Sequence, residues 1–187
     1  SVLSARLHFR TAFYNSLTTS PRGGRKQREF SMETVGLGIG ADDLPVGRKF
    51  KTVGRTITEP DIVNFINTTG MTEVLFTNYE YLEHVSAIKG RLSPGSLVFC
   101  FAEGLVIQST VQCVGQAFIE MDFKILAPTF AGDTVHVECE VIENRQSSSR
   151  PGSALVRTRN LVRKQDGTVV LEYTPLRMVR NKAEYHL

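Results

Sequence analysis

The sequence predicts one α+β domain in which an antiparallel β-sheet wraps around a single long buried helix. The run from Leu97 to Ile107 is apolar on nearly every side, which is typical of a helix buried all round. From residue 117 onwards, apolar and polar residues alternate with the period of two that marks half-buried strands. Because neither element tolerates full exposure, we expect the sheet to curl around the helix.

The elements before this helix are a strand, a short helix and a long loop. Residues 49–57 alternate loosely enough to form a first strand. Thr58 can cap a helix, with Asp61 as its acidic capping-box partner and Gly70 at its end. Residues 71–93 have no clean period, so we expect a long loop with one helical turn around residues 79–85, and long loops in compact domains are often functional.

The segments after the helix predict an antiparallel meander. Pro175 in the last strand suggests an edge or a bulge, because proline cannot donate to a β-ladder. Asp166-Gly167 is a hairpin signal between the last two strands. The four expected strands span residues 117–125, 135–141, 154–163 and 169–179.

The composition is that of an ordinary globular protein, with 41% hydrophobic and 22% charged residues. No run approaches the roughly 18 apolar residues that span a bilayer, which argues against a membrane protein. The three cysteines, Cys100, Cys113 and Cys139, lack metal-ligand spacing and lie in apolar surroundings typical of buried reduced thiols. They indicate an intracellular compartment and no metal site.

The positive charge lies at the front of the chain. Residues 1–31 carry a net charge of +5, so the rest carries −2 of the overall +3. We divide the chain into a basic leader, residues 1–35, and one domain, residues 36–182. The leader is interpreted as a mitochondrial transit peptide, as sequence upstream of a start at Met32, or as an arm that docks on a partner subunit. We expect the protein in the cytoplasm, or in the mitochondrial matrix if residues 1–31 are a transit peptide. Nucleic-acid binding is not expected, since the basic run 22–28 has no interleaved aromatics.

Two short motifs give the domain a resemblance to a known family. One is Gly90-Arg91-Leu92-Ser93-Pro94-Gly95 before the buried helix, and the other runs from Leu126-Ala127-Pro128 to Gly132-Asp133 between two strands. Over residues 46–179 the chain resembles the MaoC-like branch of the hot-dog superfamily, which includes (R)-specific enoyl-CoA hydratases and hydroxyacyl dehydratases. The resemblance implies a hot-dog fold and an acyl thioester of coenzyme A or acyl-carrier protein as substrate, with no cofactor.

The catalytic dyad of that family is missing. Its Gly-Asp-x-Asn-Pro-x-His motif, laid onto the chain from Gly70, places Met71 at the aspartate and Phe76 at the histidine. Neither side chain can titrate, whereas hydration of an enoyl thioester needs an acid and a base. Asn78 stands at the family's next acidic position. The candidate substrate contacts in this loop are therefore Met71, Phe76 and Asn78.

Two residues of the same loop are candidate replacements for the dyad. Glu73 lies within the motif and acts as acid or base if an apolar surrounding raises its pKa. His84 titrates near neutrality. The alternatives are a solvated loop carboxylate for Glu73 and a surface or packing role for His84.

The start and the middle of the buried helix hold the other candidates. The resemblance implies that Gly95, after Pro94, polarises a thioester carbonyl with its backbone N–H and the helix dipole. Ser96 caps the helix or contacts substrate, and we favour capping. Glu103 stands eight positions after Gly95, a separation found in some hot-dog thioesterases. Its alternative is an end-of-helix carboxylate facing solvent or a subunit interface.

Three functions therefore stay open: a hydratase or dehydratase with Glu73 and His84 as acid and base, a thioesterase that uses Glu103, and a binding subunit without chemistry. The first is preferred. A homodimer or higher oligomer is expected because hot-dog sheets extend across a dimer, and a silent subunit would pair with an active homologue.

Overall fold

The computed structural model describes residues 32 and 34–182, and the predicted leader lies almost wholly outside them. The chain divides into the units Ser1–Glu33 and Thr34–Leu187, and the description below concerns the second. Its elements, in chain order, are η1 (Ala41–Asp43), β1 (Lys49–Lys51), β2 (Arg55–Thr56), α1 (Glu59–Thr69), α2 (Val74–Thr77), α3 (Tyr79–His84), α4 (Gly95–Val106), η2 (Ile107–Val111), β3 (Gly115–Ile125), β4 (Thr134–Gln146), β5 (Ser153–Lys164) and β6 (Val169–Arg180).

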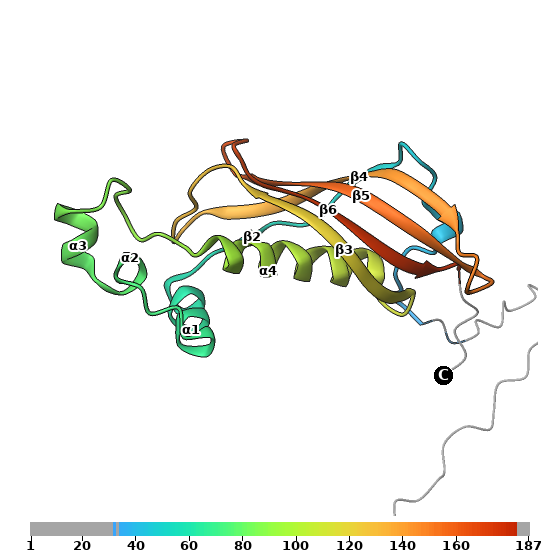
Figure 1. The fold of residues 1–187 in the computed structure, drawn as a ribbon, viewed down its shortest axis with the longest axis horizontal. Coiled ribbons are helices and arrows are strands. Elements are labelled where there is room, and N and C mark those ends of the chain that lie inside the picture. The colour runs from blue at the N-terminus through green and yellow to red at the C-terminus, as the bar shows by residue number, and fades with distance from the viewer. Residues whose placement is uncertain (1–31, 33, 183–187) are drawn as a thin grey trace, which may run out of the picture. The chain divides into compact units, whose positions relative to one another are not determined.

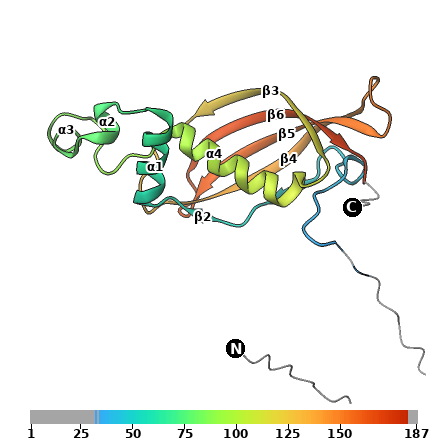
Figure 2. The same cartoon turned by 90° about the horizontal axis from the view of Figure 1, so that it is seen from below.

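One antiparallel sheet and one long helix form the domain, as the sequence predicts. The strands follow the order β1-β4-β5-β6-β3, and β2 also pairs with β4. Figure 1 shows α4 lying along one face of this curved sheet. Figure 2, seen from below, shows α4 in front of that face. The three short helices α1, α2 and α3 gather beyond the N-terminal end of α4 (Figure 1).

The core lies between α4 and the sheet. The alternation of β4 is confirmed, since Val135, Val137, Cys139 and Val141 are all buried. The first three pack in one cluster with Leu97, Val98, Ala102 and Val106 of α4 and with Ile62 and Ile66 of α1, whereas Val141 belongs to a second cluster with residues of η1, β5 and β6. This burial of apolar area is the main term that fixes α4 against the sheet.

The helix α4 departs from the prediction that it is buried all round. Cys100 and Gly104 are exposed, because the sheet covers only one side of the helix. The helix continues into the π-helical turn η2, where the hydroxyls of Ser109 and Thr110 donate to the carbonyls of Leu105 and Val106. Cys113 is exposed too, so of the three cysteines predicted to be buried only Cys139 is.

The capping signals of α1 are confirmed. Thr58 Oγ1 accepts from the Asp61 N–H, and the Asp61 carboxylate accepts from the Thr58 N–H at 2.8 Å. Gly70 ends the helix at φ 72°, a left-handed conformation that glycine adopts without a Cβ penalty. The end of α1 therefore fixes where the loop toward α4 begins.

Two elements before α4 differ from the prediction. The first strand splits into β1 and β2, because Thr52 Oγ1 accepts from the Val137 N–H and replaces a ladder bond between them. The loop of residues 71–93 contains α3, within the expected turn, and also α2, which was not predicted. A single turn of four residues is too short to show a helical period.

The last two differences concern β3 and β6. A register shift between Phe118 and Glu120 turns Phe118 to the face of the sheet that carries α4, where its half-exposed ring lies 5.2 Å from the Arg177 guanidinium. Alternation had placed Phe118 on the outer face, and a bulge adds the residue that reverses it. Pro175 was expected at an edge or a bulge, but β6 lies between β5 and β3 and has no bulge at Pro175. Instead, the pairing of β6 with β5 is interrupted at this residue.

Candidate functional site

A pocket of about 310 Å³ opens beside the N-terminal end of α4. Its lining comes from the loop before α4, the first turn of α4, the end of β3 with the segment after it, and the start of β6. The lining residues are Phe76, Ile88, Leu92, Ser93, Gly95, Val98, Ile125, Leu126, Ala127, Pro128, Thr129, Val170 and Leu171. Nearly all of them are apolar, and none carries a titratable side chain.

The first turn of α4 has free backbone donors, one of them on Gly95, which lines this pocket. Pro94 is the N-cap and has no N–H, and no side chain caps the helix. Pro94 O accepts from Leu97 and Val98, whereas the N–H groups of Gly95 and Ser96 make no hydrogen bond within residues 34–182. Free N–H groups at the positive end of a twelve-residue helix attract a partly negative oxygen. They can therefore polarise a carbonyl bound in the pocket.

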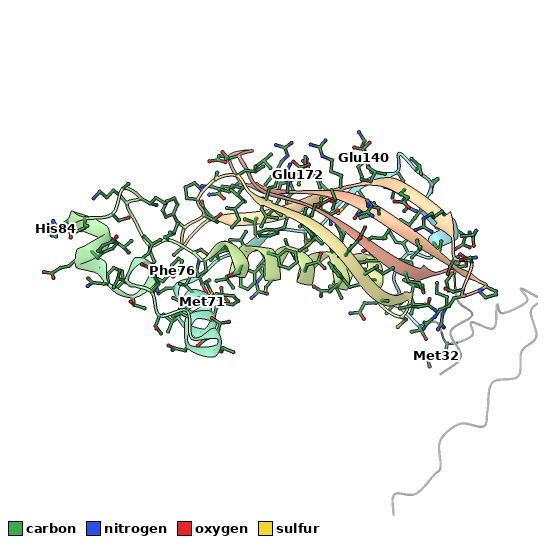
Figure 3. The ribbon with its side chains drawn as sticks, viewed as in Figure 1. Met32, Met71, Phe76, His84, Glu140 and Glu172 are labelled. Carbon is green, nitrogen blue, oxygen red and sulfur yellow. The ribbon has the colours of Figure 1, made fainter. Side chains whose placement is uncertain are left out.

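Ser96 is not the helix cap that the sequence favoured. Its hydroxyl lies 3.6 Å from the Met71 sulfur, within the first turn of the helix. Met71 therefore reaches the start of α4 although it does not line the pocket. Figure 3 shows Met71 and Phe76 on the same side as the N-terminal end of α4.

Phe76 forms one wall of the pocket and is held there through its backbone. The Arg91 guanidinium donates to the Phe76 carbonyl through Nη1 and to both carboxylate oxygens of Glu59 through Nε, at 2.8 Å each. It also lies 5.5 Å from the ring of Tyr79, whose hydroxyl donates to Glu59. This Arg91 clamp joins α1, α2 and α3 beside the pocket. Arg91 belongs to the motif before the buried helix, from which no role for its side chain was predicted.

The candidate acid and base do not line the pocket. The Glu73 carboxylate accepts from the Leu75 N–H at 2.9 Å and so caps α2, on an exposed surface. Asn78 caps α3 in the same way, through the Tyr81 N–H. The His84 side chain is 69% exposed at the end of α3, near Glu83 and away from Met71 and Phe76 (Figure 3).

Glu103 occupies a separate, buried polar cluster under the middle of α4. It is 8% exposed, and both of its carboxylate oxygens accept from Arg177 Nη2 at 2.6 Å. Burial, with the nearby charge of Glu103, raises the pKa of Tyr173 far above its ordinary range. Burial also raises the pKa of the Cys139 thiol to about 12, so both groups are neutral. The alternative of a solvent-facing Glu103 is therefore wrong, and a carboxylate committed to Arg177 is poorly available as a base.

The second sequence motif supports the pocket wall. The pKa of Asp133 is lowered overall. Burial acts to raise this pKa, but the bonds that the carboxylate accepts from the Phe130 N–H, Lys164 and Gln165 outweigh burial. The ionised Asp133 closes the turn at Gly132, which has φ 94°. This turn follows the segment 126–129 that lines the pocket. From the sequence, this turn was used only as evidence for the fold. It was not predicted that residues 126–129 line the pocket.

The comparison with protein families decides the relationship. Residues 45–173 match the family model described as "FAS1-like, dehydratase domain region", which is more than half of the chain. The chain belongs to the MaoC-like hot-dog dehydratase family. No match is found among the curated proteins.

Solved structures of this hot-dog family agree with the assignment. A monoamine oxidase regulatory protein from Archaeoglobus is 26% identical over 78% of this chain and 97% of its own, with a TM-score of 0.68. A MaoC-like dehydratase from Rhodospirillum rubrum is 25% identical over 78% and 99%, with the same TM-score. An R-hydratase from Pseudomonas aeruginosa is 21% identical over 80% and 93% with a TM-score of 0.64, and shows likeness of fold. The fold and family predictions are confirmed.

No helix within the described residues is long and apolar enough to cross a membrane. The same residues contain no group of three or more histidine, cysteine, aspartate or glutamate side chains that could hold a metal ion.

Proposed function

We propose that this MaoC-like domain binds an acyl thioester, of coenzyme A or acyl-carrier protein, at the N-terminal end of α4 and leaves acid–base chemistry to another subunit. The observation that carries the proposal is an apolar pocket that is lined by Gly95, whose N–H group is free, and by no titratable residue. The thioester carbonyl accepts from the Gly95 N–H, and the acyl group lies against Val98 and Leu171. Binding and polarisation are thereby supplied, whereas proton transfer is not.

The two enzymatic alternatives have weaker support. A hydratase that uses Glu73 needs this exposed cap of α2 to release the Leu75 N–H and turn into the pocket. His84 lies at the end of α3, away from Phe76 of the pocket wall (Figure 3). A thioesterase that uses Glu103 needs a carboxylate that is bound to Arg177 and does not line the pocket.

The edge strand β3 supports pairing with a second subunit. It carries exposed apolar side chains at Phe118, Ile119, Phe123 and Ile125, and unpaired edges of this kind invite another strand. A Mycobacterium tuberculosis protein, 22% identical over 83% of this chain and 48% of its own with a TM-score of 0.71, has a double hot-dog fold. Because Ile125 also lines the pocket, a subunit paired on β3 would border the bound thioester. That subunit is an active homologue that supplies the missing acid and base.

The test is to titrate the purified full chain with crotonyl-CoA, measuring binding by calorimetry while following loss of the enoyl absorbance and release of free thiol. We expect binding without either reaction. Hydration that disappears in Glu73→Gln but survives in Glu80→Gln, an exposed carboxylate of the same loop, would replace the proposal with the hydratase. Thiol release that disappears in Glu103→Gln would replace it with the thioesterase.

Gly95→Ala should weaken this binding about tenfold. A Cβ at Gly95 would lie 2.4 Å from Cδ1 of Ile125, so the side chain of Ile125 must shift within the pocket that it lines. A loss of about 1.4 kcal/mol corresponds to this change in Kd. Shortening the obstructing side chain in Gly95→Ala/Ile125→Val should recover most of the affinity. Gly104→Ala is the control, since a Cβ there meets no atom within 4 Å; equal effects of the two alanines would contradict the steric explanation.

A further inference from the structure

The strand β5 carries two polar residues at positions that face the core. Val156, Thr158, Asn160 and Val162 lie on the same side of this strand, because side chains alternate with a period of two, and all four are buried. The two valines suit an apolar core, whereas the hydroxyl of Thr158 and the amide of Asn160 do not. Buried polar groups need hydrogen-bond partners, since burial removes the partners that bulk water supplies.

Tyr173 of β6 brings a third polar group to the same place. It is paired with Asn160 across the antiparallel ladder, so the two side chains are neighbours on one face of the sheet. The Tyr173 ring is 1% exposed and lies edge-on to Phe99 of α4 at 5.3 Å, so this face is the one that packs against α4. Burial raises the pKa of Tyr173, the charge of Glu103 raises it further and Asn160 lowers it, so the phenol hydroxyl lies near both groups.

The polar atoms of these three residues have no hydrogen-bond partner within the described part of the chain. They are Thr158 Oγ1, Asn160 Oδ1, Asn160 Nδ2 and the Tyr173 hydroxyl, and each is fully buried. The nearby Glu103 carboxylate accepts only from Arg177 Nη2 among the described residues, so it retains capacity to accept. Native cores satisfy nearly all of their buried polar atoms. Four such atoms on two adjacent strands therefore indicate a shared partner.

The charge and the space around these atoms define that partner. The cluster has no net charge, because Glu103 is balanced by Arg177 and because Tyr173 and Cys139 stay protonated. An ion would therefore be buried without compensation. The three residues with unpartnered atoms line neither the pocket beside α4 nor a second one over β1 and β4, which favours a partner smaller than an organic ligand. Water is small and neutral, and it both donates and accepts.

We propose that the buried polar cluster under α4 is an internal water-binding site, in which water joins Asn160 and Tyr173 to the Glu103 carboxylate. The water accepts from the Asn160 amide or the Tyr173 hydroxyl and donates to Glu103, which gives it the several polar partners that an internal water needs. Because these residues belong to β5, β6 and α4, the water ties the middle of α4 to the sheet. The site is independent of the acyl-thioester function proposed above.

A high-resolution crystal structure of the full chain tests the site directly. We expect a water oxygen within about 3.2 Å of Asn160 Nδ2 or the Tyr173 hydroxyl and of a Glu103 carboxylate oxygen. In solution, magnetic relaxation dispersion of the water nuclei counts long-lived internal water molecules, and Asn160→Leu/Tyr173→Phe should lose about one of them. Asn160, Tyr173 and Glu103 bonded directly to one another, with no water between them, would overturn the proposal.

Urea denaturation of Tyr173→Phe and Asn160→Leu adds a test of sign. A hydrated cluster loses a hydrogen bond in each variant, so the folding equilibrium constant should fall roughly fivefold. A cluster without water would be relieved of a buried unpartnered group in each variant, so urea midpoints that rise or stay unchanged in both would contradict the water site. Tyr81→Phe, which removes the hydroxyl of a half-buried tyrosine in α3, is the matched control and should leave the midpoint unchanged.

Discussion

Glu103→Leu should lower the free energy of unfolding by about 3–5 kcal/mol, the range for removing one partner of a buried ion pair. The substitution leaves the Arg177 guanidinium under α4 without its carboxylate, in a region where both residues are almost fully buried. The Phe118 ring, 5.2 Å away, remains a favourable contact of this cation. Urea denaturation at fixed protein concentration measures the change.

The double variant Glu103→Leu/Arg177→Met separates the ion pair from packing. Replacing both charges by apolar side chains removes the unpaired ion, so we expect the double variant to regain most of the lost stability. The exposed pair Lys49–Glu140 gives the matched control, and Glu140→Gln should cost less than about 1 kcal/mol. A double variant as unstable as Glu103→Leu would show that the loss comes from side-chain volume and not from the charge.

The affinity of Glu103→Leu for an acyl thioester, measured beside its stability, tests whether Glu103 serves the site. A carboxylate whose replacement costs stability and leaves acyl-thioester binding unchanged is a structural partner of Arg177. Tyr173 and Cys139 lie in the same cluster and stay neutral, because burial raises both of their pKa values. The cluster therefore contains one paired carboxylate and no free nucleophile.

The fold could be predicted because its signals are local. The apolar run of α4, the alternation of β4 and the capping residues Thr58 and Gly70 each act through residues next to them in the chain. The misses occurred where a distant partner decides the outcome. The bulge that turns Phe118 inward depends on the pairing of β3 with β6, and exposure of Cys100 depends on how far the sheet reaches around α4.

The site could be predicted only in part, since the candidates Phe76 and Gly95 lie in the pocket lining and the others do not. Pro94 and Gly95 are typical of a helix start, and the structure places both at the start of α4. The side-chain candidates were chosen by type and by nearness in the loop, which located neither Glu73 nor His84 in the lining. Thr129 lies in a different segment, and only the bridge between Leu92 and Phe130 brings it beside Ser93. Spacing along the chain carries no signal for such a contact.

Arg91→Met should lower the free energy of unfolding by about 2–3 kcal/mol and weaken acyl-thioester binding. The arginine side chain is 14% exposed and makes charge-assisted bonds to Glu59 and to the Phe76 carbonyl, each of the kind worth about 1.5–3 kcal/mol. Its loss frees the backbone of Phe76, which forms a pocket wall. Hydrogen exchange in residues 74–84 should therefore rise more than exchange in β4 or β5.

Arg91→Lys tests whether geometry or charge holds the clamp. A lysine keeps the charge but cannot present a planar fork to a carboxylate and a carbonyl at once, so we expect little recovery of protection in residues 74–84. Arg145→Met, at an exposed arginine paired with Glu143, is the matched control and should leave protection unchanged. Full recovery in Arg91→Lys would mean that a positive charge beside Glu59 is sufficient. If protection falls equally across β4, β5 and residues 74–84, Arg91 stabilises the whole domain and does not specifically position the pocket wall.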